Sequence, residues 1–276
     1  MLNWLEPSAI PASWEPPLGA SRQQSQTRAK GLRPAGAANM PIVVVASQKG
    51  GSGKTTIAAH LAVQAGLKGH KPAVLIDADW QGSLGRWWRA RNDDALALAT
   101  LNPSERSAIR ADELVASITE RGRGGSAITV IDTPPARTAA IEQIIAIADL
   151  VLIPVRPSPH DLHAVGATVE MARRTGRPFF FVINCAAPRA NITVQAIAAL
   201  SEHGPVAPVF LHQRVAYAAS MTDGRTVVEP PVSLKAAREI AELWEHVGSR
   251  LNIGSTSRAA AMSLSVQCGA AGGLAA

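Results

Sequence analysis

Short runs of apolar, β-branched residues alternate along the chain with longer segments in which apolar residues recur at helical spacing. Near-continuous apolar runs predict buried parallel strands, since such strands are covered on both faces. Strands are expected at Ile42–Ala46, Ala73–Asp77, Ala127–Asp132, Leu150–Val155, Phe179–Asn184 and Ala207–Phe210. Helices are expected at about 55–68, 105–121, 138–147, 161–175 and 192–203, with a last helix from Ser233. The pattern predicts an α/β fold, with a mainly parallel twisted sheet, helices on both faces and a single domain.

The two ends of the chain lack this alternation. Residues 1–40 are rich in Pro, Ser, Gln, Arg and Ala, and residues 251–276 are mostly Ser, Ala and Gly. We therefore expect a disordered leader over 1–40, a folded domain over 41–250 and a disordered tail over 251–276. Met40 stands directly before the first strand, which leaves open whether translation begins there or the basic leader is genuine.

Composition and charge narrow the class of protein. Hydrophobic residues make up 47% of the chain, which is ample for a core, but no window reaches the roughly 18 unbroken apolar residues of a membrane span. The formal charge of +6 permits weak, salt-sensitive contact with nucleic acid without requiring it. The chain has two cysteines, which give no disulfide framework, so a reducing cytoplasm is the natural setting.

The strongest chemical signal is the segment Gln48–Thr56, which reads Gln-Lys-Gly-Gly-Ser-Gly-Lys-Thr-Thr between the first strand and the first helix. Its glycines allow a tight turn whose N–H groups, together with the helix N-terminus, attract a phosphate. Lys54 would reach the β- and γ-phosphates, and the Thr55 hydroxyl would ligate Mg²⁺. Gln48 occupies the position where this motif normally has its first glycine, and Lys49 adds a second cation.

The segment from Lys49 to Thr56 resembles the deviant phosphate loop of the ParA/MinD family of ATPases, in which the early lysine contacts nucleotide across a dimer interface. The resemblance implies ATP and Mg²⁺ as cofactors, with Lys49 and Lys54 as catalytic cations. The implied nucleotide-binding residues of the loop are Gly50, Gly51, Ser52, Gly53, Lys54, Thr55 and Thr56.

Two carboxylates, Asp77 and Asp79, follow the second strand at the edge where open α/β sheets bind ligands. Alternate residues leaving a strand point the same way, so both could converge on the phosphates. The segment is similar to the Asp-x-Asp-Pro-Gln motif of the ParA family, which implies that Asp77 lies near Mg²⁺ and that Asp79 positions or activates the attacking water. Trp80 stands in place of the motif's proline, which alters backbone stiffness but removes neither carboxylate.

Two further strand ends carry polar groups. Asp132 ends an apolar strand in the form of the Walker B element, whose aspartate binds Mg²⁺ directly or through water. Asn184 ends another strand with an amide that can both donate to and accept from an adenine edge, and the resemblance implies that it recognises the base. The expected metal set is therefore Thr55, Asp77 and Asp132, and Asn184 joins the nucleotide-binding residues.

The resemblance implies a cytoplasmic, nucleoid-associated ATPase that forms a homodimer with ATP, binds DNA non-specifically and is released on hydrolysis. Its function would be partition of plasmid or chromosome DNA together with a ParB-like adaptor. The chain is expected to lack the N-terminal helix-turn-helix domain of larger relatives. The candidates for DNA contact are Arg189, Arg214, Arg225, Lys235 and Arg238.

A MinD-like, membrane-associated positioning ATPase is the alternative reading. No membrane contact is expected, because the terminus of this chain lacks the basic amphipathic helix of that relative. A nitrogenase-type reductase is disfavoured, since it needs cluster-bridging cysteines and Cys185 falls inside an expected strand.

Overall fold

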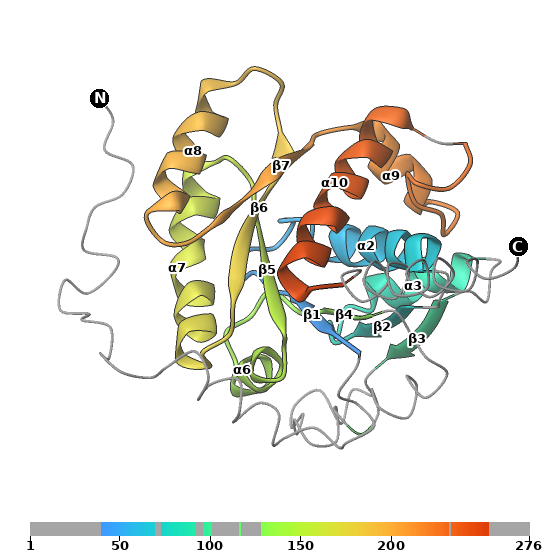
Figure 1. The fold of residues 1–276 in the computed structure, drawn as a ribbon, viewed down its shortest axis with the longest axis horizontal. Helices are drawn as coiled ribbons and strands as arrows, with labels where there is room; N and C mark the ends of the chain where they lie inside the picture. Colours follow the sequence, from blue (N-terminus) through green and yellow to red (C-terminus); the bar gives the residue numbers. More distant parts are fainter. Residues whose placement is uncertain are drawn as a thin grey trace, which may run out of the picture.

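The computed structural model describes residues 40–69, 73–91, 96–100, 128–231 and 233–253, and Ala116. These residues form one parallel sheet of seven strands in the order β3-β2-β4-β1-β5-β6-β7 (Figure 1). The strands are β1 (Ile42–Val45), β2 (Ala73–Asp77), β3 (Leu96–Thr100), β4 (Thr129–Asp132), β5 (Leu150–Val155), β6 (Phe179–Ala186) and β7 (Val206–His212). The predicted parallel α/β domain is confirmed.

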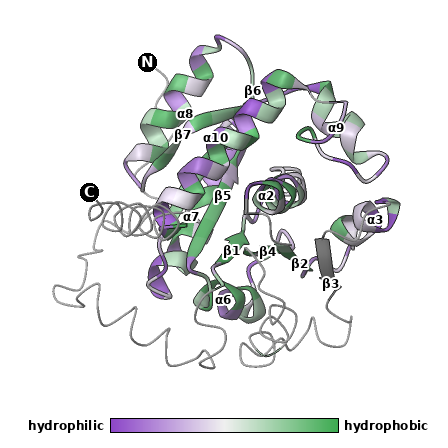
Figure 2. Cartoon of the chain, turned by 45° about the vertical axis from the view of Figure 1, so that its right-hand side comes forward, coloured by the Kyte–Doolittle hydropathy of each residue, from purple (hydrophilic) through white to green (hydrophobic). Residues whose placement is uncertain are grey.

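Helices cover both faces of the sheet, and the hydrophobic strands, green in Figure 2, lie between them. On one face the core is shared with α2 (Lys54–Gly69), α3 (Ser83–Ala90), α9 (Val215–Met221) and α10 (Leu234–Leu251). On the other face it is shared with α6 (Ala139–Ala146), α7 (Pro159–Arg174) and α8 (Asn191–Ser201). Among the described residues, no helix is both long and apolar enough to cross a membrane.

Strand β1 shows why an unbroken apolar run encodes the centre of this sheet. Val43 and Val45 pack against the core beneath α2 and α10, whereas Ile42 and Val44 pack against the core beneath α6 and α7. All four side chains are at most 2% exposed. Neither face of the strand tolerates a polar residue, so the run has no period-two alternation. The phosphate loop leaves the carboxyl end of this central strand.

The expected elements agree closely with the structure, and the bounds of β2 and β5 are those expected. Three elements were not expected: β3, α3 and α9. Strand β3 reads Leu-Ala-Leu-Ala-Thr, and alanine favours strands poorly. Helices α3 and α9 have eight and seven residues, too few for a helical period to stand out.

Other expectations fall on residues that the structure does not describe. Apart from Ala116, the helix expected over 105–121 lies outside the described residues, as do 1–39 of the expected leader and 254–276 of the expected tail. Helix α10 reaches Leu251, so the folded part extends past the expected boundary at residue 250.

Candidate nucleotide-binding site

The phosphate-loop segment forms the turn between β1 and α2. Residues 48–53 leave the carboxyl end of β1, and α2 begins at Lys54. Gly51 and Gly53 have φ of +73° and +95°, a region that residues with a side chain rarely adopt. The first N–H groups of a helix have no acceptor within it, so this turn aims donors and partial positive charge at one point. An anion such as a phosphate fits there.

Asn184, near the end of β6, holds the loop from the opposite side. Its Nδ2 donates to the Ser52 carbonyl at 2.7 Å, and the side chain is only 8% exposed. A Cβ at Gly53 would lie 2.0 Å from the same Nδ2, so the glycine is required by a close approach as well as by its backbone. Adenine recognition by Asn184 stays a prediction, but its amide has a structural partner within the loop.

Thr55 and Asp132 come together where β4 ends beside α2. The Thr55 hydroxyl donates to Asp132 Oδ2 at 2.6 Å, and Asp132 is fully buried. Its Oδ1 has no hydrogen-bond partner among the described residues. Burial raises the pKa of Asp132 to about 7, and the negative charges of Asp77 and Asp79 act in the same direction.

These two residues fit a magnesium ion. Mg²⁺ takes oxygen ligands such as carboxylates, and its charge would stabilise the ionised form of a carboxyl whose pKa burial has raised. The unpartnered oxygen of Asp132 supplies one such ligand beside the Thr55 hydroxyl. Both residues of this pair belong to the metal set expected from the sequence.

Asp77, the third residue of that set, has other partners. It is the register partner of Asp132 on the neighbouring strand and is fully buried. Its two oxygens accept the backbone N–H groups of Asp79 at 3.1 Å and Gly85 at 2.8 Å. The carboxylate therefore fixes the turn after β2 and the first turn of α3. Its metal role stays a prediction.

The two lysines of the loop differ in their surroundings. Lys54 is 6% exposed, and its Nζ donates to the Lys49 carbonyl at 3.1 Å. Burial lowers the pKa of Lys54, while the charges of Asp132 and Asp79 act in the opposite direction. Within the described part of the chain, no hydrogen bond or ion pair is found for the ammonium of Lys49. Among the described residues, Lys49 thus contacts the loop through its backbone.

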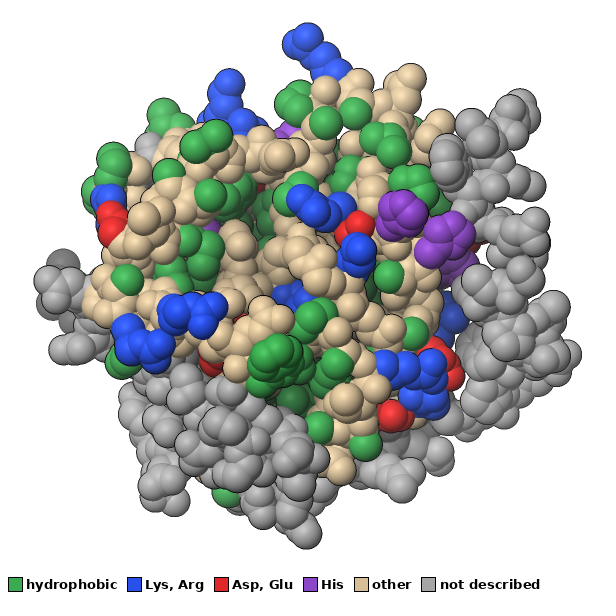
Figure 3. All heavy atoms as spheres, turned by 180° about the vertical axis from the view of Figure 1, so that it is seen from behind, with side chains coloured by type: hydrophobic (Ala, Val, Ile, Leu, Met, Phe, Trp, Pro, Cys, Tyr) green, Lys and Arg blue, Asp and Glu red, His purple; other side chains and the backbone are tan. Residues whose placement is uncertain are grey.

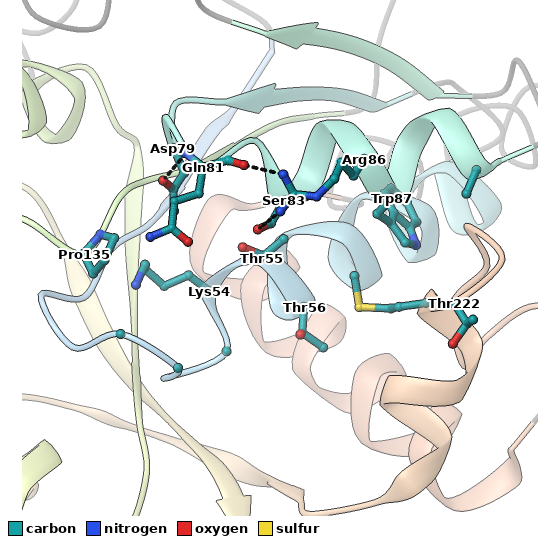
Figure 4. A pocket seen from close by; sticks show the side chains of 15 residues that line it. Lys54, Thr55, Thr56, Asp79, Gln81, Ser83, Arg86, Trp87, Pro135 and Thr222 are labelled. Carbon is teal, nitrogen blue, oxygen red and sulfur yellow. Dashed lines mark hydrogen bonds between the residues drawn. The ribbon is translucent and has the colours of Figure 1, made fainter. Parts of the chain in front are cut away.

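A cleft of about 640 Å³ opens over the loop (Figure 4). Lys54, Thr55 and Asp79 line it, as do the three glycines of the loop. The cleft is also lined by residues that were not among the expected site residues. They are Gln81, Ser83, Arg86, Trp87 and Ala90 from the α3 side, Met221 and Thr222 at the end of α9, and Pro135.

The outer wall of the cleft is held by contacts between distant parts of the chain. Trp87 Nε1 donates to the Arg225 carbonyl at 3.0 Å. Arg91, just after α3, donates to both oxygens of Glu229 at 3.0 and 2.6 Å and to the Gly224 carbonyl at 2.9 Å. Such a forked pair fixes direction as well as distance. Helix α3 and the segment 222–231 are thus joined as one wall.

His60 connects this wall to the phosphate-loop helix. The side chain is fully buried in α2, with Nδ1 2.8 Å from the Thr56 carbonyl, while Nε2 accepts the Val227 N–H at 3.2 Å. The Val227 bond requires a lone pair on Nε2, so the ring is neutral with its proton on Nδ1. Burial lowers the pKa of His60 to about 4. A lone histidine in a helix gives no sequence signal for this long-range bond.

Among the candidates for DNA contact, two arginines are engaged within the fold. Arg214 donates to Glu239 through Nε at 3.0 Å and through its terminal nitrogen at 2.5 Å. Arg225 bonds Asp223 and the Pro230 carbonyl. Arg189, Lys235 and Arg238 are exposed. Nothing in the sequence indicated that Arg214 is engaged, because its acidic partner lies 25 residues away, whereas the partner of Arg225 stands only two residues before it.

Comparison with known proteins supports the same kind of site. A family profile described as the CobQ/CobB/MinD/ParA nucleotide binding domain matches residues 43–227. Maintenance of carboxysome distribution protein A (McdA) of Gloeobacter kilaueensis is 32% identical over 215 residues, which cover 76% of this chain and 94% of that protein.

Two solved structures show the fold. The ATP complex of an aspartate variant of McdA from Cyanothece has a TM-score of 0.60 at 19% identity, covering 78% of this chain and 98% of that one. MinD with Mg-ADP from Pyrococcus horikoshii has a TM-score of 0.59 at 17% identity, covering 75% of this chain and 96% of that one. The ligands named for these neighbours are the cofactors expected from the sequence.

Proposed function

Because the chain belongs to the CobQ/CobB/MinD/ParA nucleotide-binding domain family, we propose that it is a Mg²⁺-dependent ATPase that positions a cargo. Its ATP-bound form is a homodimer that binds DNA without sequence specificity and dissociates from the DNA after hydrolysis. The observation that carries the ATPase proposal is the hydrogen bond from Thr55, which lines the cleft beside Lys54 and the loop glycines, to the buried carboxylate of Asp132.

The residues of the site divide the chemistry between them. The loop N–H groups and Lys54 bind the phosphates, and Thr55 and Asp132 hold the metal ion. When bound there, Mg²⁺ neutralises charge on the β- and γ-phosphate oxygens. Asp79 lies in the same cleft at 6% exposure and orients the attacking water. Phosphoryl transfer needs little more than such positioning and charge.

Lys49 is proposed to supply a second cation to the nucleotide of the partner subunit. Lys54 already serves the phosphates of its own loop, and the Lys49 ammonium has no partner among the described residues. Hydrolysis would then depend on dimerisation, because a monomer lacks one of the charges that stabilise the transition state.

The DNA and cargo parts of the proposal rest on the family resemblance and the relatives. On the face shown in Figure 3, basic side chains stand in small groups, several beside acidic ones, rather than in one broad patch. Such a surface suits weak, salt-sensitive DNA contact that two subunits together make stronger. Lys235 and Arg238, exposed at the start of α10, are the leading candidates.

The cargo is proposed to be recognised through an adaptor protein, ParB-like if the cargo is DNA. The name of the Gloeobacter relative points to a second candidate, a carboxysome or similar protein body. In both cases the protein would work on the nucleoid in the cytoplasm.

DNA retardation with ATP, with ADP and without nucleotide tests the DNA part of the proposal. Retardation of unrelated DNA fragments only with ATP, weakening as salt rises, is the expected result. The variant Lys235→Ala/Arg238→Ala should hydrolyse ATP normally but retard DNA less. Equal retardation in all three nucleotide states would contradict the proposal.

Mixing two inactive variants tests the role of Lys49. Lys49→Ala and Asp79→Ala are each expected to fail in hydrolysis. If lysine and aspartate at one site come from different subunits, a heterodimer has one site with both lesions and one with neither. Part of the wild-type rate should then return. No recovery, despite heterodimers demonstrated by differential tags, would place both residues in one subunit.

A further inference from the structure

The loop from Asp79 to Gly82 joins the proposed hydrolysis residue to α3. Asp79 Oδ1 accepts the Gln81 N–H at 2.9 Å, and the Asp79 carbonyl accepts the Gly82 N–H at 2.9 Å. Gly82 itself has φ of +65°. The direction of the Asp79 carboxylate therefore depends on the conformation of the residues that follow it.

Arg86 closes this loop from α3. One terminal nitrogen donates to the Gln81 carbonyl at 2.6 Å, and the other donates to Ser83 Oγ at 3.1 Å. The Arg86 N–H also donates to the Gly82 carbonyl at 3.0 Å. One planar guanidinium thus joins a residue of the loop to the first residue of α3, and its charge strengthens both bonds.

The same loop lacks a covalent constraint that the similar motif has. Trp80 stands where the similar Asp-x-Asp-Pro-Gln motif has proline, and tryptophan does not fix its own φ as proline does. The Trp80 side chain is 68% exposed, so packing of its ring against the core is not what holds the loop. The two guanidinium bonds of Arg86 instead hold Gln81, directly after Trp80, and Ser83, directly after Gly82.

We infer that Arg86 is a positioning residue for hydrolysis, which holds Asp79 in place by fixing the loop through Gln81 and Ser83. The inference rests on the proposed ATPase function. Arg86 also lines the cleft, so the competing role is direct contact with the phosphates of the nucleotide. The two roles differ in what they change: a positioning residue affects turnover, whereas a phosphate ligand affects nucleotide affinity.

Arg86→Ala is the primary variant, and Arg89→Ala is the matched control, since Arg89 is exposed on the same helix and does not line the cleft. Arg86→Ala should lower kcat about fivefold, as expected for losing one or two such hydrogen bonds, and leave the Kd for ATP within about twofold. Arg89→Ala should change neither. Amide hydrogen exchange at Gln81 and Gly82 should become about fivefold faster in the Arg86 variant without nucleotide.

Trp80→Pro supplies the rescue. Proline restricts the conformations that the loop can adopt without the Arg86 bonds. The loss of kcat and of exchange protection caused by Arg86→Ala should therefore be smaller in the Trp80→Pro background than in the wild-type background. Exchange at Gln81 and Gly82, which requires no activity, is read in all four proteins of this cycle. Equal acceleration of exchange in both backgrounds would overturn the inference.

Two other results would also overturn it. One is unchanged kcat in Arg86→Ala, and the other is a weakened Kd for ATP with unchanged exchange, which would make Arg86 a phosphate ligand. Failure of the ATPase function itself is recognised separately. In that case the wild-type protein would hydrolyse ATP no faster than Lys54→Ala does.

Discussion

At the sheet end of the nucleotide cleft, Lys54 is 6% exposed and Asp132 is 0% exposed. Lys54 is the first residue of α2, and Asp132 is the last residue of β4. At the outer wall, Arg86 is exposed and α3 is joined to the segment 222–231 by Trp87 and Arg91. The sheet end is fixed by burial on a rigid scaffold, whereas the wall is fixed by polar contacts between distant segments. We therefore expect substitutions at the sheet end to act on binding and those at the wall to act on turnover.

Lys54→Ala should have the largest effect, because it removes a buried cation from the point where the phosphates bind. ATP affinity should fall about 1,000-fold, as for the loss of one partner of a desolvated charge pair. Titration calorimetry measures it. Lys68→Ala, exposed near the far end of the same helix, should bind ATP like the wild type. Equal affinity in the two variants would refute the phosphate-loop assignment.

Asp79 lies between the two regions, and two substitutions separate its roles. Asp79→Ala should lower kcat about 100-fold while ATP still binds, since water positioning is lost. It should also trap the dimer on DNA. Asp79→Asn retains an oxygen to accept the Gln81 N–H but lacks the negative charge. If Asp79→Asn were as active as wild type in a steady-state assay, the residue would serve only to shape the loop.

His60 links the two regions, and acid should weaken the link. Its folded pKa of about 4 lies below the unfolded value of 6.5, so the neutral ring stabilises the fold above pH 6.5 and this stability is lost as pH falls toward 4. At pH 5 the loss should be about 2 kcal/mol.

Urea unfolding at pH 7.5 and pH 5 measures the His60 effect. His60→Gln should lose less stability between the two values than wild type does, because glutamine does not titrate. His163→Gln, exposed on α7, should follow wild type. Parallel losses in wild type and His60→Gln would mean that His60 contributes nothing to the pH dependence.

Asn184→Ala should have the smallest effect on stability, about 1 kcal/mol, for the lost bond to the Ser52 carbonyl. If the side chain also reads adenine, the preference for ATP over GTP should narrow in competition binding. Asn191→Ala, exposed at the start of α8, is the control for both measurements. An unchanged preference would leave Asn184 as a support for the loop alone.

The sheet end could be predicted from the sequence because its residues are tied to local pattern. An apolar run followed by Gly-Gly-Ser-Gly-Lys-Thr positions Lys54 and Thr55, and a run ending in Asp places Asp132 at the same edge of the sheet. Each of these inferences needs only a strand and its end. The strand order was not predicted, and the structure alone shows that β4 pairs with β2 and brings Asp77 and Asp132 side by side.

The wall could not be predicted, because its contacts pair residues far apart in the chain. Arg91 and Glu229 are 138 residues apart, and His60 and the Val227 N–H are 167 apart. Helix α3 has too few residues for a helical period, so Arg86 had no element to be placed on. The partners of Asn184 and Arg214 were missed for the same reason: their sequence neighbours give no hint of them.

The close approach of Gly53 and Asn184 also couples the effects of mutation at these two positions. Any side chain at position 53 would meet the amide of residue 184 at 2.0 Å, in addition to the strain of its left-handed backbone. A side chain at 53 would therefore displace the amide of residue 184 from its bond to the Ser52 carbonyl. A smaller residue at 184 would relieve the contact but not the backbone strain, so glycine at 53 is favoured even without the asparagine.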